Sequence, residues 1–161
     1  MAVNVLESWR VNLPKELSGS PVVVLANMAP VNQLEMLDQC NAVERFVLAD
    51  TMDLWIGIAR EELEKVLARI DLLVINETEA REYAATSNLM KAGALLRAKV
   101  PEYVVIKLGE FGAILFGPPE VNNGLFRCGA FPLREVADPT GAGDTFLGAM
   151  AGYLASLGTT D

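Results

Sequence analysis

The sequence predicts an α/β fold, in which a mainly parallel sheet is flanked by helices and carries an antiparallel hairpin at one edge. From Pro21 onward, short β-branched runs alternate with helical patterns, which is typical of βαβ units in a parallel sheet. Between residues 113 and 128, two β runs are separated by turn residues alone, which leaves no room for a helix. The 161 residues are 52% hydrophobic, so we expect one core and one domain.

The first three elements follow Pro21 directly. Val22–Ala26 is an uninterrupted apolar run and is predicted to be a buried strand. In Val31–Cys40, apolar residues recur among polar ones at the spacing of a short amphipathic helix. Arg45–Ala49 is the second predicted strand, and Asp50 stands at its carboxyl end.

Trp55–Ile70 is the clearest helical segment, because its apolar residues recur every three or four positions and charged residues fill much of the rest. The elements after it are predicted as a strand, two helices and a strand: Asp71–Ile75, Glu77–Ala85, Asn88–Ala98 and Tyr103–Lys107. Short strands at Ala113–Phe116 and Leu125–Cys128 form the predicted hairpin. A helix rich in Gly and Ala, Ala142–Leu157, is the last predicted element.

Charge and composition exclude several classes of protein. The formal net charge of −8 argues against a nucleic-acid partner or an anionic membrane surface. The chain has no histidine, and Cys40 and Cys128 lie outside any metal-binding pattern, which excludes zinc sites and histidine-based triads. Neither a signal peptide in Met1–Arg10 nor a membrane span is indicated. We therefore expect a cytoplasmic protein with free thiols and no membrane partner.

The nine residues Asp138–Phe146 carry the strongest chemical signal. Gly141 and Gly143 stand at the start of a predicted helix, where backbone N–H groups can face an anion, and Asp144 places a carboxylate beside them. This arrangement indicates phosphoryl transfer. The alternative is an ordinary tight turn with an acidic residue in the first helical turn, where acidic residues are favoured anyway. A dinucleotide-binding turn fits less well, since Phe146 stands where its third glycine would be.

Three motifs, in the expected order along the chain, resemble those of the ribokinase-like (PfkB) carbohydrate kinases. Asn76–Glu79 is similar to the family's NxxE motif, Lys107–Gly112 to its nucleotide-binding GxxG turn, and Asp138–Asp144 to its C-terminal signature. The resemblance covers Pro21–Leu157, the C-terminal, nucleotide-binding part of a family member. It implies a ribokinase-like fold and a kinase that uses ATP and Mg²⁺ to phosphorylate a hydroxyl of a sugar, or of a sugar-like or nucleoside-like small molecule.

The resemblance also implies roles for the residues of the signature. Asp144 corresponds to the base that accepts the proton of the substrate hydroxyl. The backbone N–H groups of Gly141, Ala142 and Gly143 would form an anion hole reinforced by the helix N-terminus, and Thr140 would contact the nucleotide. Positioning and charge stabilisation carry most of the catalysis in such a reaction.

The two other motifs have one role each in the family and one simpler alternative. Asn76 and Glu79 would hold Mg²⁺ or its waters beside the phosphates, or would form a helix cap, and the two roles are compatible. Gly109 and Gly112 would let the nucleotide approach the backbone. Lys107 replaces the Thr often found in the family, and either contacts a phosphate or ends its strand in solvent.

Asp50–Asp53 resembles the family's D-x-N region, with Asp53 where Asn is common. It follows the second predicted strand, at the edge where α/β folds place functional loops. Three large side chains near it, those of Phe46, Met52 and Trp55, are predicted to line the core or a cleft rather than to stack on a base.

Both ends of the chain are expected to be cut. Met1–Ser20 shows neither the sugar-binding glycines nor the small sheet lid of the family's N-terminal half, and the segments that complete the adenine environment would follow residue 161. A second hypothesis therefore stays open. The chain would be a non-catalytic nucleotide-binding or assembly module, with an unpaired sheet edge that promotes a homodimer.

Overall fold

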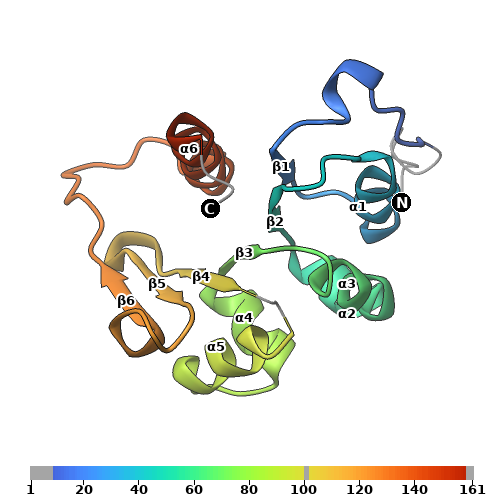
Figure 1. The fold of residues 1–161 in the computed structure, drawn as a ribbon. Coiled ribbons are helices and arrows are strands. Elements are labelled where there is room, and N and C mark those ends of the chain that lie inside the picture. The colour runs from blue at the N-terminus through green and yellow to red at the C-terminus, as the bar shows by residue number, and fades with distance from the viewer. Residues whose placement is uncertain (1–8, 100–101, 159–161) are drawn as a thin grey trace.

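The fold is built on one six-stranded sheet, seen in a computed structural model that describes residues 9–99 and 102–158 (Figure 1). The strands follow one another in chain order from edge to edge. The first four are parallel: β1 (Val22–Leu25), β2 (Phe46–Asp50), β3 (Leu72–Asn76) and β4 (Tyr103–Lys107). The hairpin of β5 (Ala113–Phe116) and β6 (Leu125–Cys128) continues the sheet in antiparallel pairing. The predicted α/β class, with its parallel sheet and edge hairpin, is confirmed.

Helices cover the two faces of the sheet unequally. Five lie on one face: α1 (Pro30–Gln39), α2 (Asp53–Ile58), α3 (Arg60–Leu67), α4 (Glu77–Ala84) and α5 (Leu89–Arg97) (Figure 1). The opposite face carries α6 (Ala142–Leu157), which packs against β1 and β2. Three short 3₁₀ turns complete the described elements, at Lys15–Leu17, Gly109–Phe111 and Asn122–Gly124.

The central strands are apolar throughout because both of their faces are buried. Along β2, Val47 and Ala49 belong to the core under α1–α5, whereas Leu48 between them belongs to the smaller core under α6. The same alternation places Val74 and Val105 under α6. This is the expected pattern for parallel strands between two helical layers, and it explains the short, uninterrupted apolar runs of the sequence.

The predicted single helix Trp55–Ile70 is wrong in one respect, since the structure has two helices there. The break lies at Ala59, whose φ of −135° and ψ of 37° are not helical. Because α2 contacts α4 while α3 packs on α1, the two segments bury their apolar residues against different neighbours. A straight helix could not satisfy both contacts, although the apolar spacing continues across the break.

The other predicted elements are confirmed, with boundaries that differ by at most one residue. Four of them have the predicted boundaries: β4, β5, β6 and α6. None of the helices within residues 9–99 and 102–158 is long and apolar enough to cross a membrane. The expectation that Met1–Ser20 lacks an acceptor half falls partly outside the described residues, since the description begins at residue 9.

The face that carries α6 is only partly covered. A mainly apolar cavity of about 670 Å³ lies between α6 and strands β2 to β6. Its lining includes Phe46, Leu72 and Tyr103, which are the first residues of β2, β3 and β4. The cavity therefore extends toward the amino ends of the parallel strands, whereas the polar residues considered next stand at their carboxyl ends.

Candidate active site

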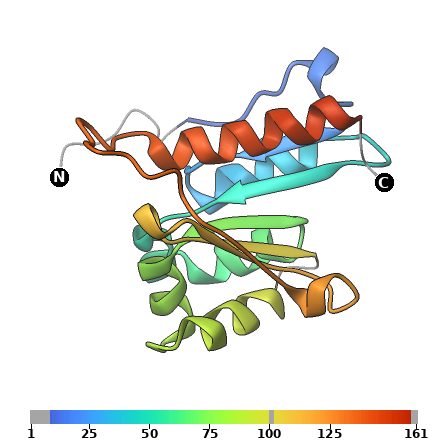
Figure 2. The same ribbon diagram turned by 90° about the vertical axis from the view of Figure 1, so that its left-hand side faces the viewer.

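Polar side chains end three neighbouring parallel strands. Asp50, Asn76 and Lys107 are the last residues of β2, β3 and β4. The N-terminus of α6 lies at the same end of the sheet, as Figure 2 shows. Segments distant in the sequence therefore meet where the parallel strands end, the place at which open α/β sheets bind ligands.

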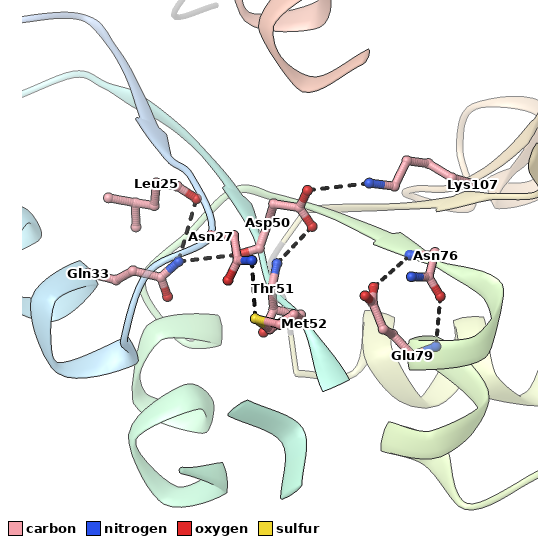
Figure 3. A network of polar contacts seen from close by, with 9 residues as sticks. All are labelled: Leu25, Asn27, Gln33, Asp50, Thr51, Met52, Asn76, Glu79 and Lys107. Carbon is pink, nitrogen blue, oxygen red and sulfur yellow. Dashed lines mark hydrogen bonds and ion pairs between the residues drawn. The ribbon is translucent and has the colours of Figure 1, made fainter. Parts of the chain in front are cut away.

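Asp50 and Lys107 form an ion pair across β3. The distance from Lys107 Nζ to Asp50 Oδ2 is 3.3 Å, and the two side chains are 18% and 9% exposed (Figure 3). Strands two apart in a sheet are separated by roughly 9.5 Å, which the Lys and Asp side chains together can span. Both residues continue the alternation of Leu48 and Val105, so they lie on the face of the sheet that carries α6.

The backbone around Asp50 is fixed by a buried glutamine. Gln33 of α1 donates from Nε2 to the carbonyl oxygen of Asp50 at 3.1 Å (Figure 3). The same Nε2 donates to the carbonyl oxygen of Ala26, also at 3.1 Å. The Thr51 N–H donates to Asp50 Oδ1 at 2.8 Å. Burial raises the pKa of Asp50 above its ordinary value, while the Lys107 ammonium and the Thr51 N–H act in the opposite direction.

Asn76 and Glu79 form a capping box at the start of α4. The Glu79 N–H donates to Asn76 Oδ1 at 2.9 Å, and the Asn76 N–H donates to Glu79 Oε2 at 3.0 Å (Figure 3). Burial raises the pKa of Glu79, and the Asn76 N–H opposes this effect. The capping alternative is therefore realised, and it leaves Glu79 Oε1 for another partner. Within the described part of the chain, no three acidic or cysteine side chains lie close enough to hold a metal ion by themselves.

Gly109 and Gly112 flank a 3₁₀ turn between β4 and β5, and their surroundings differ. A Cβ on Gly109 would meet open space, whereas a Cβ on Gly112 would stand 2.0 Å from the backbone oxygen of Cys128. The φ of Gly112 is also +93°, a value that side-chain-bearing residues rarely adopt. At Gly112 the close neighbour is thus the chain that leaves β6, and the open surface lies at Gly109.

The start of α6 is shaped by its own loop. Gly141 has φ +77° and is the N-cap, and the Ala142 N–H donates to the Pro139 carbonyl at 3.1 Å. Because the Ala142 N–H already donates to Pro139, it is less available to an anion than the anion-hole prediction required. Hydrogen bonds from the Thr140 hydroxyl and from the Thr140 N–H, the latter at 2.8 Å, lower the pKa of Asp138. These contacts stabilise the turn that precedes the helix.

At Gly143 the N-terminus of α6 meets the polar residues that end the parallel strands. A Cβ built on Gly143 would lie 3.0 Å from Lys107 Nζ, so the ammonium sits directly against the first turn of α6. Asp144, the next residue, is exposed to solvent and is close enough to Asp50 to contribute to the raised pKa of that carboxyl. A cation, a helix N-terminus and an accessible carboxylate therefore share one small volume, a combination suited to binding an anion beside a base.

Comparison with known sequences decides the family. A sequence profile of the pfkB family carbohydrate kinases matches residues 16–160. The chain belongs to this family. A cytidine kinase from Thermococcus kodakarensis is 28% identical over 146 residues, a match that covers 88% of this chain and 50% of that protein. The chain thus spans about half the length of this pfkB relative.

Solved structures of ribokinases share the fold. Ribokinase from Arabidopsis thaliana, complexed with ribose and ATP, superposes with a TM-score of 0.69 at 26% identity, over 85% of this chain and 44% of that one. A structure from E. coli assigned as ribokinase II, in complex with ATP and Mg²⁺, gives a TM-score of 0.70 at 22% identity, over 89% and 49%. The predicted ribokinase-like fold is confirmed.

Two residues of this candidate site were not among the sequence-based site candidates. Asp50 was noted only at the carboxyl end of a predicted strand and in a D-x-N resemblance, and Gln33 was not singled out. Their signal was weak but present, since each is a polar residue that interrupts or directly follows an apolar pattern.

Two residues that the sequence analysis named near Asp50 form their own contacts. The exposed Asp53 accepts a hydrogen bond from the Leu54 N–H at 2.8 Å, and Trp55 Nε1 donates to Asn27 Oδ1 at 3.0 Å.

Proposed function

We propose that residues 1–161 are the nucleotide-binding portion of an ATP-dependent kinase that phosphorylates a hydroxyl of a sugar or nucleoside-like small molecule. One observation carries the proposal. Lys107 Nζ lies against Gly143 at the N-terminus of α6, with the accessible carboxylate of Asp144 one residue further on. A phosphoryl group needs a cation and backbone donors, and its acceptor hydroxyl needs a base.

The proposed roles follow from these positions. Asp144 accepts the proton of the acceptor hydroxyl, because its carboxylate is exposed at the start of α6. The N–H groups of Gly141 and Gly143 stabilise the charge of the transferred group, with a smaller share from Ala142, whose N–H also donates to Pro139. Thr140 contacts the nucleotide beside this hole, and Lys107 contacts a phosphate. When bound, ATP supplies the phosphoryl group and Mg²⁺ neutralises its charge.

Glu79 and Asn76 are proposed to act on Mg²⁺ through its waters. Glu79 uses one carboxylate oxygen in the capping box, so the other can accept from a metal-bound water. Such an outer role agrees with the preference of Mg²⁺ for few protein ligands and several waters. Gly109 is the proposed point of nucleotide approach, because the space beside it is open, and Gly112 supports that turn.

The acceptor class is proposed from the relatives. The Thermococcus protein is a cytidine kinase, and the Arabidopsis ribokinase structure contains ribose. Both acceptors carry ribose hydroxyls, so a ribose or ribonucleoside hydroxyl is the first substrate to test. The free thiols of Cys40 and Cys128 agree with the reducing cytoplasm that we propose as its compartment.

The test is phosphoryl transfer. ADP formation is measured with ribose, other sugars and nucleosides as acceptors, for the full-length gene product and for Asp144→Asn. We expect the variant to lose turnover by at least about a hundredfold, since general-base catalysis contributes that much or more, and to retain ATP binding. Asp38→Asn, at an exposed carboxylate paired with Arg69, is the control that should keep full activity. Activity retained by Asp144→Asn would disprove the base assignment.

A further inference from the structure

The ion pair of Asp50 and Lys107 is the most shielded in the described part of the chain. The side chains of Lys107 and Asp50 are 18% and 9% exposed, whereas every other pair between described residues has at least one side chain more than one-third exposed. Withdrawing two charges from water costs free energy that their attraction only partly returns, so a pair like this is a poor source of stability. Its position at the ligand end of the sheet indicates a role in binding.

Asp50 is held more firmly than an ordinary carboxylate. Its carbonyl accepts from Gln33 Nε2, and its Oδ1 accepts from the Thr51 N–H, so the backbone and one carboxylate oxygen are fixed before Lys107 is considered. The remaining oxygen, Oδ2, is the one that faces Lys107 Nζ (Figure 3). Asp50 is therefore a rigid anchor for a flexible partner.

Lys107 is the flexible partner, and the anchor decides where its charge lies. A lysine ammonium has three N–H donors on a four-carbon stem, and fixing such a side chain costs conformational entropy. One donor is used by Asp50, and Nζ lies against the first turn of α6 beside Gly143. The donors that Asp50 does not use are thus available at the helix N-terminus.

We propose that Asp50 is a positioning residue, which holds the Lys107 ammonium at the start of α6 so that it meets the terminal phosphoryl group of the bound nucleotide. The inference rests on the proposed function, because it needs a nucleotide at that helix N-terminus. Asp50 itself does not touch the nucleotide, since its carboxylate would repel a phosphate. All of its effect passes through Lys107.

This arrangement makes a distinctive prediction for ligand preference. A cation placed at the terminal phosphoryl group favours ATP over ADP, because ADP lacks that group. Loss of Asp50 should therefore weaken ATP binding while leaving ADP binding nearly unchanged. A general structural defect would weaken both nucleotides together.

The experiment is calorimetric titration of the 161-residue chain with MgATP and with MgADP. Asp50→Asn should lose about tenfold in ATP affinity, the value of one hydrogen bond to a charged group, with a far smaller change for ADP. In the background of Lys107→Met, adding Asp50→Asn should cause no further loss for either nucleotide. Asp38→Asn, which removes the exposed carboxylate of the Arg69 pair, is the matched control and should leave both affinities unchanged.

A second readout requires no nucleotide. The ε-methylene NMR signals of Lys107 in the free protein should shift in Asp50→Asn and stay in place in Asp38→Asn. Should Asp50→Asn fold poorly because Lys107 is left unpaired, the double variant remains for comparison with Lys107→Met, since the double variant leaves neither a buried lysine nor a buried carboxylate unpaired.

Three results would contradict the inference. They are equal losses of ATP and ADP affinity in Asp50→Asn, no loss at all, or a further loss in the Lys107→Met background. Each of these leaves the proposed function standing, because the wild-type chain still binds nucleotide. A wild-type chain that binds neither ATP nor ADP overturns the proposed function, and the inference falls with it.

Discussion

Lys107 Nζ lies 3.0 Å from the point where a Cβ on Gly143 would stand. The strand β4 and the helix α6 that carry these residues come together only in the folded chain. Gly143 thus has a reason to be glycine besides its place at a helix start, since its missing side chain makes room for the ammonium beside the backbone.

Replacing Gly143 with Ala should displace Lys107 and spare the fold. The φ of Gly143 is not positive, and the neighbour that a methyl group would meet is the mobile end of a side chain. The stability change should therefore stay within about 1 kcal/mol, because Ala is favoured over Gly inside helices. ATP affinity should fall by about tenfold, the value of a displaced charged hydrogen bond. Thermal unfolding and MgATP titration measure the two effects.

The control for this variant is Gly148→Ala, on the same helix, where a Cβ meets nothing within 4 Å. It should keep its ATP affinity and gain up to about 1 kcal/mol of stability, because Ala is favoured over Gly in a helix interior. Unchanged ATP affinity in Gly143→Ala would mean that Lys107 does not contact the phosphate of the bound nucleotide.

Gly112→Ala should destabilise the protein strongly. The new Cβ would lie 2.0 Å from the Cys128 carbonyl oxygen and would also require φ near +93°. Backbone cannot move aside as a side chain can, so we expect a loss of more than about 3 kcal/mol, the upper range for strain at a special backbone position. Denaturant unfolding measures it.

Gly109→Ala is the matched comparison in the same turn. Its φ is +58°, but a Cβ there meets nothing within 4 Å. Only the left-handed conformation is penalised, at about 1 kcal/mol. A loss of stability as large in Gly109→Ala as in Gly112→Ala would show that contact with the chain after β6 does not cause the destabilisation of Gly112→Ala.

The sequence was sufficient for elements whose signal is local. Strands β4, β5 and β6 and helix α6 have their predicted boundaries, because turn residues and apolar periodicity bracket each of them. The break at Ala59 was not predictable in this way, since it depends on the contact of α2 with α4. Periodicity alone cannot reveal that two halves of one pattern face different neighbours.

The same distinction applies to the site. The loop Asp138–Asp144 and the box of Asn76 and Glu79 are local motifs, and their positions could be read from the sequence. The pair of Asp50 and Lys107 joins residues 57 positions apart across an intervening strand. Its existence depends on strand order and register, which the sequence did not provide. The glycine pattern was similarly ambiguous, since the chain after β6, rather than open space for a ligand, lies beside Gly112.

Glu79 should make the protein less stable as the pH rises. Burial raises the folded-state pKa of this carboxyl above the ordinary 4.5, with Asp50 and Asp53 adding to the rise and Lys107 and the Asn76 N–H opposing it. Its favourable contribution is therefore complete below about pH 4.5 and is lost as the pH rises through the raised folded-state value. Glu79→Gln keeps a side-chain acceptor for the capping box and removes this charge.

The measurement is the free energy of unfolding from pH 4.5 to pH 8, for the wild type and Glu79→Gln. The variant should gain stability relative to the wild type as the pH rises. Glu82→Gln, at an exposed position of the same helix, should run parallel to the wild type. Parallel curves for Glu79→Gln as well would mean that burial does not penalise the Glu79 carboxylate.

Gln33→Met should damage both the fold and the site. The side-chain amide joins the ends of β1 and β2 by donating to the carbonyls of Ala26 and Asp50, and a methionine of similar size leaves those oxygens without a donor. We expect a loss of about 2 kcal/mol, the cost of leaving buried polar groups unpaired. Because Asp50 anchors Lys107, ATP affinity should fall as well.

Gln39→Met provides the comparison, since Gln39 also forms hydrogen bonds with the backbone, at Val11 and Leu13, but far from the site. Gln39→Met should lose stability without any change in the preference for ATP over ADP. If that preference is also unchanged in Gln33→Met, the backbone at Asp50 does not control the position of Lys107.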